Sequence, residues 1–277
     1  MDNIRAPFLR LMACAAVAIL STVPADLQAA SDAEQQAELA KKLANPVAAL
    51  ISVPFQYNYD EHYGAADEGS VHRLNIQPVI PASLSDNWNL ITRAILPLVD
   101  QNDIPSPDQG KSGVGDITAS LFLSPKAPTE NGWIWGVGPV ALLPTASDEM
   151  LGAEKWGLGP TAVGLKQVGP WTMGALVNHI WSVAGEDDRA DINSTFLQPF
   201  LFYITSTKTT LGVSVESTYD WENEAWSVPI NVTVSQLLKI GPQIVQIGVG
   251  ARYWAESPDN GPEDWGARAS ITFLFPK

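Results

Sequence analysis

The sequence predicts an all-β chain folded as a transmembrane, antiparallel, up-and-down β-barrel of about twelve strands, with a short N-terminal helix. Three observations support this prediction. Apolar and polar residues alternate repeatedly, tryptophans lie near the ends of the expected strands, and the connections alternate between long and short. Only 17% of the 277 residues are charged, and the formal net charge of −14 makes nucleic acid an unsuitable partner.

Residues 1–30 have the order of a secretory signal peptide. Arg5 and Arg10 precede an apolar run, and small residues follow it, so we expect cleavage between Ala25 and Ala30. The stretch LMAC resembles a lipoprotein box, but the apolar run follows Cys14 instead of preceding it, so we expect no lipid there. Cleavage would remove the only cysteine and leave the mature chain without a disulfide or a cysteine metal site.

Residues 31–46 are expected to form a short helix and a linker ahead of a barrel formed by residues 47–277. In SDAEQQAELAKKL, Ser31 is the expected N-cap and Glu34 occupies the capping-box position. Asn45-Pro46 should end the helix. The sequence leaves open whether this helix fills the barrel lumen or lies in the periplasm.

The predicted strands are segments of about ten residues in which side chains alternate with a period of two. In VPFQYNYD, for example, Val53 and Phe55 share one face while Gln56 and Asn58 share the other. The facing of His179 and Gln198 is not settled by the pattern. An even number of strands of this length fits a transmembrane barrel. The expected strands lie near residues 53–60, 74–80, 87–98, 115–123, 132–143, 156–166, 171–183, 192–204, 210–220, 228–236, 243–253 and 267–275.

A soluble sandwich also alternates, so the composition of the two faces has to decide between the two folds. The polar face is rich in Asn, Gln, Ser, Thr and Gly, whereas a face in bulk water would carry many Lys and Glu. The tryptophans match two aromatic girdles at the membrane interfaces. We place Trp88, Trp133, Trp135 and Trp171 at one side, and Trp156, Trp181, Trp221, Trp226, Trp254 and Trp265 at the other.

The connections and the C-terminus indicate a bacterial outer membrane. Odd connections are long and acidic, while even connections are mostly shorter and poor in acid, as in outer-membrane barrels whose long loops face outward. The last segment, RASITFLFPK, resembles the terminal signal that the barrel-insertion machinery reads, with Phe273 and Phe275 as its aromatics. Ser270 stands where glycine is usual, and Pro276-Lys277 follow the last aromatic. We expect a monomer whose partners are outer-membrane lipid, lipopolysaccharide and this machinery.

Most of residues 45–277 also resembles a known family, the outer-membrane proteins grouped under the label "meta-pathway of phenol degradation". The resemblance lies in PVAALISVPFQYNYD, NIQPVIPASLSDNWNLITRAILPL, GVGDITASLFLSP, GPTAVGLKQVGPWTMGALVNHIWSVAGEDDR and ARYWAESPDNGPEDWGARASITFLFPK. It implies a passive route for small, often hydrophobic or aromatic, compounds. It names no substrate and supplies no catalytic residues.

Charged residues on the polar face are the candidate lumen residues. They could line a channel and tune its selectivity, or they could pair and fill a narrow lumen, because a twelve-stranded barrel is intermediate in width. The leading hypothesis is a passive channel for small molecules, and the alternative is a structural or sensor barrel with a filled lumen. The candidates are Arg93, Asp116, Glu216, Asp220, Arg252 and Arg268.

A barrel enzyme acting on lipids is a third and weaker hypothesis. His179 and Ser182 are three residues apart, which places them on opposite faces of a strand, so we expect no enzyme and no catalytic residue. His62 and His72 form no metal-type cluster. The acidic loops GEDDRAD and PDNGPEDW could bind Ca²⁺ or bridge lipopolysaccharide, but neither has calcium-loop spacing, so we expect no cofactor or metal.

Two similar stretches, WGVGP and WGLGP, belong to one part of the predicted wall. No helix follows either, which excludes a phosphate loop. The four glycines should face the lumen, and the prolines cannot donate ladder hydrogen bonds. We predict a weakened seam, serving as a docking groove for the N-terminal helix or a side exit for apolar solutes; alternatively, the glycines only relieve curvature. The seam residues are Gly136, Gly138, Pro139, Gly157, Gly159 and Pro160.

Overall fold

The computed structural model of the chain describes residues 25–276, with side chains described from residue 34 onward. The expected signal peptide falls mainly on residues 1–24, which lie outside the described residues, so its cleavage stays a prediction. Residues 36–277 form one compact unit, and this unit contains the barrel. Among the described residues, no helix is both long enough and apolar enough to cross a membrane.

The N-terminal helix α1 spans Ala25–Leu43. Its predicted end is confirmed, because the chain turns directly before Asn45-Pro46 and Asn45 Oδ1 accepts a hydrogen bond from the Val47 amide at 3.0 Å. Its predicted start is wrong: Ser31 lies inside the helix and does not cap it. The preceding residues, ADLQAA, are mostly strong helix formers, so the helix continues through them.

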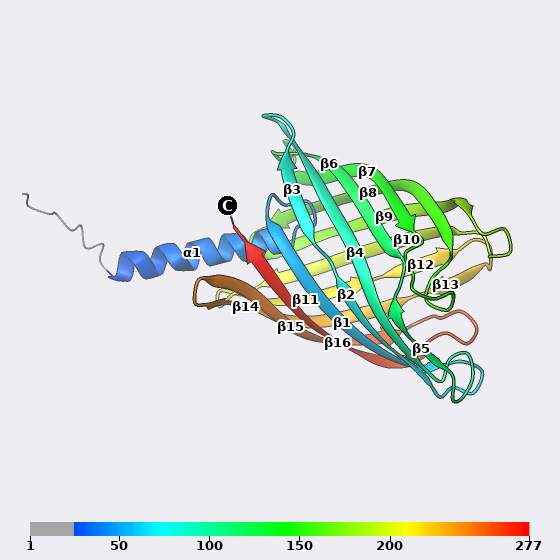
Figure 1. Cartoon of the computed structure of the whole chain (residues 1–277). Helices are drawn as coiled ribbons and strands as arrows, with labels where there is room; N and C mark the ends of the chain where they lie inside the picture. Colours follow the sequence, from blue (N-terminus) through cyan, green and yellow to red (C-terminus); the bar gives the residue numbers. More distant parts are fainter. Residues whose placement is uncertain (1–24, 277) are drawn as a thin grey trace, which may run out of the picture. The chain divides into compact units, whose positions relative to one another are not determined.

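Sixteen strands form one antiparallel sheet that closes into a barrel (Figure 1). Four pairs of consecutive strands, β2/β3, β5/β6, β11/β12 and β13/β14, each continue along one line of the wall, so the wall has twelve strands as predicted. The strands are β1 (Ile51–Tyr63), β2 (Gly69–Ile76), β3 (Val79–Ser83), β4 (Trp88–Asn102), β5 (Gly110–Val114), β6 (Ile117–Pro125), β7 (Trp133–Leu143), β8 (Lys155–Val168), β9 (Trp171–Gly185), β10 (Asn193–Ile204), β11 (Thr209–Val215), β12 (Ser217–Asp220), β13 (Ala225–Ser227), β14 (Pro229–Ile240), β15 (Gln243–Trp254) and β16 (Asp264–Phe275).

Closure of the barrel comes from the two ends of the chain. The first strand, β1, pairs with the last, β16, from Ile51 opposite Phe275 to Tyr59 opposite Ala267. Short turns such as 169–170 and 241–242 lie at one end, here called the short-turn end. The other end, the long-loop end, carries longer connections such as 144–154 and 255–263. Several predicted loops are partly strand, because β1, β4 and β9 extend into them.

The breaks within wall strands occur beside prolines, a feature that the predicted continuous strands lacked. Proline has no amide proton for the ladder, so the chain leaves regular pairing there. At three breaks, the amide of the interrupted strand donates instead to a proline carbonyl on a neighbouring strand. These bonds are Gln77 to Pro54 at 2.8 Å, Gly115 to Pro97 at 2.9 Å, and Glu216 to Pro229 at 3.0 Å.

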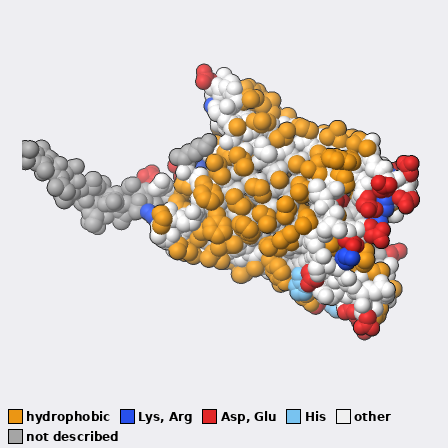
Figure 2. Space-filling model, viewed as in Figure 1, with side chains coloured by type: hydrophobic (Ala, Val, Ile, Leu, Met, Phe, Trp, Pro, Cys, Tyr) orange, Lys and Arg blue, Asp and Glu red, His pale blue; other side chains and the backbone are white. Residues whose placement is uncertain are grey.

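The outer face of the barrel is a broad apolar band, and acidic side chains gather at the long-loop end (Figure 2). Large apolar residues such as Leu158, Val213 and Val249 are exposed on it, as expected for a surface covered by lipid. Seven tryptophans belong to the exposed set: Trp133, Trp156, Trp171, Trp181, Trp221, Trp226 and Trp265. Trp254 does not belong to the girdle, because its indole Nε1 donates to the buried Asp60 at 2.9 Å.

The inner face is less polar than predicted. A buried apolar cluster joins inward side chains of strands β4, β6, β8, β9 and β10, which belong to one continuous part of the wall. Its members include Ile91, Phe122, Leu165, Leu176 and Phe200. The lumen of the described barrel is therefore partly filled by apolar side chains instead of being lined only by polar ones.

Candidate functional site: the barrel lumen

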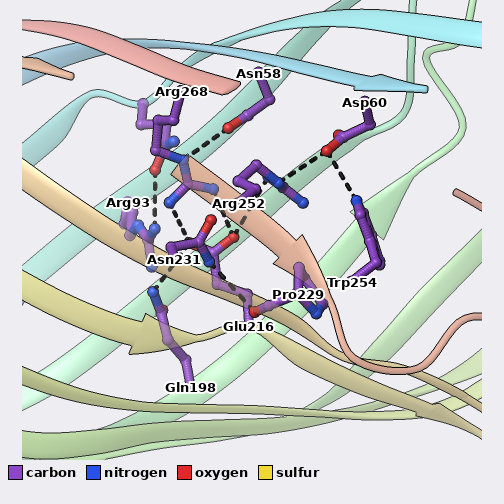
Figure 3. Close-up of polar contacts among 11 residues, drawn as sticks. Asn58, Asp60, Arg93, Gln198, Glu216, Pro229, Asn231, Arg252, Trp254 and Arg268 are labelled. Carbon is purple, nitrogen blue, oxygen red and sulfur yellow. Dashed lines mark hydrogen bonds and ion pairs between the residues drawn. The ribbon is translucent and has the colours of Figure 1, made fainter. Parts of the chain in front are cut away.

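The centre of the lumen holds a network of charged and amide side chains (Figure 3). Arg268 binds Glu216 through two parallel hydrogen bonds, both 2.8 Å long, and its Nε donates to Asn58 Oδ1 at 2.7 Å. Glu216 reaches inward from the break between β11 and β12, where Gln198 Nε2 lies 3.5 Å from its Oε1. A forked pair of this kind fixes both side chains in position.

A second ion pair lies beside the first, closer to the long-loop end. Arg252 Nε is 3.0 Å from Asp60 Oδ1, at an angle unsuited to a hydrogen bond, so the contact is an ion pair. The Arg252 guanidinium also lies 5.1 Å from the Trp254 ring centroid and 3.9 Å from Glu216. Trp254 therefore supports the pair from both sides, by its hydrogen bond to Asp60 and by a cation–π contact.

Arg93 stands apart from these ion pairs. Its Nη2 donates to Gln77 Oε1 at 2.9 Å, and Gln77 lies at the break between β2 and β3. Among the described residues, no carboxylate oxygen lies within 4 Å of the Arg93 guanidinium. Its charge is therefore the one in the central network that lacks a direct acidic partner in the described part of the chain.

Three cavities follow one another through the lumen. A vestibule of about 870 Å³ at the long-loop end is lined by acidic residues, including Asp220 and Glu256. It shares Ser194 and Thr218 with a second cavity of about 270 Å³. Arg93 lines both this second cavity and a third, of about 250 Å³, which extends to the N-terminal segment.

The N-terminal segment, defined as residues 36–50, packs into the short-turn end. Leu39, Ala40 and Leu50 are at most 6% exposed and form a cluster with wall residues that include Leu237 and Leu274. The Lys41 carbonyl accepts a hydrogen bond from Gln167 Nε2 at 2.8 Å. Of the two positions left open by the sequence, residues 36–43 of the helix occupy the barrel end and contribute to filling the lumen.

The remaining predicted lumen residues lie at the long-loop end, away from the central network. Asp116 accepts hydrogen bonds from the Ala146 and Ala153 amides, at 3.0 and 2.6 Å, and so holds the loop 144–154 in place. Asp220 lines the vestibule and caps its own turn by accepting from the Glu222 amide at 2.9 Å. The structure thus brings together Arg93, Glu216, Arg252 and Arg268 but not these two.

The predicted seam residues lie on β7 and β8, whose mutual pairing is continuous. Pro139 stands directly opposite Pro160 in this ladder. Pairing is interrupted instead on the outer flanks, between β6 and β7 beside Gly138 and between β8 and β9 beside Gly159. Gly157 follows a register shift at the start of β8. These glycines allow the flanking strands to approach closely, because a side chain at Gly138 or Gly159 would collide with a neighbouring carbonyl.

Gly136 is the seam glycine that meets the N-terminal segment. A Cβ atom at Gly136 would lie 3.1 Å from Val47 Cγ1 and 3.3 Å from the Phe122 Cβ. Val47 is 4% exposed and belongs to the linker after α1, so the linker, and not the helix itself, contacts the seam. A role of the seam as a side exit stays a prediction.

We expect Gly159→Ala to destabilise the barrel by roughly 1–3 kcal/mol, because the added methyl overlaps the His179 carbonyl. Gly164 is the matched control on the same strand, since a Cβ there meets no atom within 4 Å and Gly164→Ala should change little. Urea unfolding in detergent micelles, followed by tryptophan fluorescence, compares the two variants. Equal stability of both variants would show that the close approach at Gly159 is unimportant.

His179 and Ser182 share no hydrogen bond. His179 Nδ1 lies 2.7 Å from Thr195 Oγ1. The His179 ring lies beside that of the exposed Trp181, with centroids 4.1 Å apart and planes tilted by 52°, which places it in the outer aromatic girdle. Ser182 Oγ donates to Asp191 Oδ1 at 2.9 Å in the loop at the long-loop end. The described geometry thus joins His179 to Thr195, and Ser182 to an acidic loop.

Acidic loop residues at the long-loop end are held by local partners. The Ser182 hydroxyl, followed by the Lys155 ammonium 3.4 Å away, keeps the pKa of Asp191 below its ordinary value. In the same way the Lys111 ammonium lowers the pKa of Asp148. No group of three or more His, Cys, Asp or Glu side chains suited to a metal ion occurs among the described residues.

Sequence reasoning missed Gln198 and Trp254 as lumen residues, whereas it put Gln77 on the polar face without naming it as a candidate. The period-two pattern contained the signal for Trp254, because Arg252 faces inward and the residue two positions later shares its face. Gln198 could not be placed, since its neighbour Glu216 is known only once the register of β10 with β12 is known. Gln77 follows the regular part of β2, where the pattern ends.

The fold and the lumen define a class, the twelve-stranded outer-membrane β-barrels. An outer membrane channel from Pseudomonas putida F1 is similar, with a TM-score of 0.64 and 18% identity over 82% of this chain and 96% of that one. The NanC porin has a TM-score of 0.51 and 10% identity over 82% and 100% of the two chains. Outer membrane phospholipase A from Escherichia coli has a TM-score of 0.51 and 11% identity over 87% and 98%.

At these identities the likenesses show the fold alone. No protein-family model matches the chain, and no curated protein matches it. The family resemblance noted in the sequence is therefore an expectation still, whereas the outer-membrane barrel fold is established.

Proposed function

We propose that the protein is a passive outer-membrane channel for small, hydrophobic or aromatic molecules and that it acts as a monomer after signal-peptide cleavage. The observation that carries this proposal is the row of three cavities along the lumen, in which each cavity shares lining residues with the next. The likeness to a protein described as a channel and to one described as a porin supports the same proposal.

The mixed lining of the lumen suits such solutes. Apolar side chains such as Phe196 and Leu176 face the same space as Asn178 and Ser120. Binding sites for small molecules commonly combine an apolar surface with a few polar groups that orient the ligand. A solute with one ring and one polar group could therefore exchange contacts along the path without being held tightly at any point.

The described conformation corresponds to a closed channel. The N-terminal segment occupies the short-turn end, and the third cavity ends against Lys42, Leu43 and Ala44 of this segment. Passage to the periplasm then requires the segment to move or a solute to leave through the wall. We propose movement of the segment, because it is joined to the barrel chiefly by apolar packing and one hydrogen bond to the wall, from Gln167.

Electrical and osmotic measurements test the channel. Purified protein in planar bilayers and in liposomes should show intermittent conductance and solute-driven swelling. An absence of both, in the full chain and in a variant lacking the N-terminal segment, would contradict an open state of any kind.

A structural or sensor barrel with a filled lumen is the second candidate. The paired charges around Glu216 and the packing of Leu39 and Ala40 favour it, because both reduce the free space in the lumen. This candidate function predicts no conductance in any experiment, including those in which the N-terminal segment is removed. We propose no enzymatic role and no catalytic residue, cofactor or metal.

A further inference from the structure

We propose that the 250 Å³ cavity binds a small carboxylate that carries an aromatic ring or an apolar group of similar size, with the carboxylate on Arg93. This inference rests on the proposed channel function and names the class of solute. Three features support it: the positive charge of the lumen, the unused donors of Arg93, and a cavity lining that is partly charged and partly apolar.

The central network carries more positive than negative charge. Three guanidinium groups, of Arg93, Arg252 and Arg268, face the two carboxylates of Asp60 and Glu216. Both carboxylates are engaged by Arg252 and Arg268, which leaves the excess charge at Arg93 within the described residues. A charge away from bulk water is stabilised most by an ion of opposite sign, so this position favours an anion.

The guanidinium of Arg93 has donors to spare. Its one side-chain hydrogen bond among the described residues, to Gln77, uses a single N–H of the five that arginine carries. Arg93 is half-buried and lines cavities on two sides, so its exposed surface faces the lumen. A planar fork of N–H groups matches the two oxygens of a carboxylate better than it matches a hydroxyl or a single carbonyl.

The same cavity also has an apolar lining. Phe200 and Phe202, whose rings stack with centroids 5.4 Å apart, line it together with Val79 and Leu50. Its volume is slightly below the ~300–1,000 Å³ typical of pockets for drug-sized ligands, so a molecule with a single ring fits better than a larger one. The lining of the cavity thus combines the Arg93 guanidinium, which has no direct acidic partner among the described residues, with a stacked aromatic pair; the second cation in the lining, Lys42, pairs with Glu38 at 2.7 Å.

Benzoate and its neutral analogue benzamide are matched probes, since they share shape and ring and differ in charge. Binding is measured by isothermal titration calorimetry on full-length barrel in detergent micelles, with protein-free micelles as the blank. The buffer contains about 0.15 M salt, because the acidic vestibule disfavours anions when screening is weak. Acetate, which lacks the ring, tests how much the apolar lining contributes to binding.

Arg93→Gln should weaken benzoate binding roughly tenfold to hundredfold and leave benzamide binding nearly unchanged. Arg93→Lys keeps the charge but lacks the planar fork of N–H groups, so its affinity for benzoate should lie between those of wild type and Arg93→Gln. Arg73→Gln is the charge control: Arg73 is exposed, pairs with Asn58 in the ladder and lines neither inner cavity, so benzoate binding should stay at the wild-type level. Heat-dependent migration in gels verifies that each variant is folded.

The proposal is overturned if wild type binds benzoate no better than benzamide, or if Arg93→Gln binds benzoate as wild type does. Acetate binding as tight as benzoate binding would overturn the requirement for a ring or an apolar group of that size. Conductance is recorded on the same preparations. A conducting barrel without benzoate preference refutes this inference alone, whereas silence of both the full chain and the variant without the segment refutes the channel.

Discussion

A variant that lacks the N-terminal segment, residues 36–50, is expected to conduct ions steadily in planar bilayers, whereas the full chain opens only intermittently. These residues fill the short-turn end and include Leu39 and Ala40, which pack against Leu237 and Leu274 of the wall. Their removal joins the third cavity to the periplasmic side. The measurement is single-channel recording of both proteins under the same salt and voltage.

A point substitution separates opening from other effects of a deletion. Ala40 is 1% exposed, so Ala40→Asp places a charge in an apolar cluster and should expel the segment and raise conductance. Glu38→Gln is the control, because Glu38 lies on the exposed side of the same helix, where it pairs with Lys42 at 2.7 Å. Equal conductance of wild type, Ala40→Asp and the deletion would contradict closure by this segment.

Glu216→Gln is expected to lower the free energy of unfolding by about 3–5 kcal/mol, the range for removing one partner of a buried ion pair. Glu216 receives two hydrogen bonds from Arg268 and lies 3.9 Å from Arg252, so its loss leaves the buried Arg268 without an acidic partner and Arg252 with Asp60 alone. Urea unfolding in micelles, followed by tryptophan fluorescence, measures the change.

Two controls accompany this experiment. Glu222→Gln removes an acid of the exposed loop 221–224 and should leave stability unchanged. Replacing Glu216 and Arg268 together by methionine should recover part of the loss, because an apolar pair carries no unpaired charge. If Glu216→Gln is as stable as wild type, the network contributes nothing to the barrel.

The sequence was sufficient for the architecture. Period-two alternation together with residues such as Trp133 and Phe275 predicted twelve antiparallel strands, and closure of β1 on β16 confirms them. This succeeded because lipid outside and a confined lumen inside impose opposite compositions on the two faces of every strand. The breaks in four wall strands were missed. A proline interrupts pairing with the neighbouring strand, and one sequence does not show which residues of that strand stand opposite the proline.

The candidate site was predicted only in part. Alternation put Arg93, Glu216, Arg252 and Arg268 on the polar face. The structure joins the last three by ion pairs, while Arg93 contacts Gln77. Their pairing with residues more than a hundred positions away, such as Arg268 with Asn58, depends on closure of the barrel. The filling of the lumen by residues 36–50 could not be predicted either, because apolar residues in a short helix do not show which surface they cover.

An engineered disulfide, which can be reduced again, tests directly whether the barrel is a channel closed by its N-terminal segment. Val47 and Gly136 are close enough for a disulfide, since a Cβ at Gly136 would lie 3.1 Å from Val47 Cγ1 and bridged Cβ atoms lie about 3.5–4.5 Å apart. The double variant Val47→Cys, Gly136→Cys is made in a chain whose single cysteine, Cys14, is replaced by serine.

Planar-bilayer conductance of this double variant is recorded before and after addition of a reductant. We expect no conductance when the disulfide is formed and the return of channel openings when it is reduced, while the wild type responds to neither treatment. Unchanged conductance in the oxidised, fully cross-linked protein would contradict closure by the segment, and silence of the reduced variant, the wild type and the deletion would contradict a channel altogether.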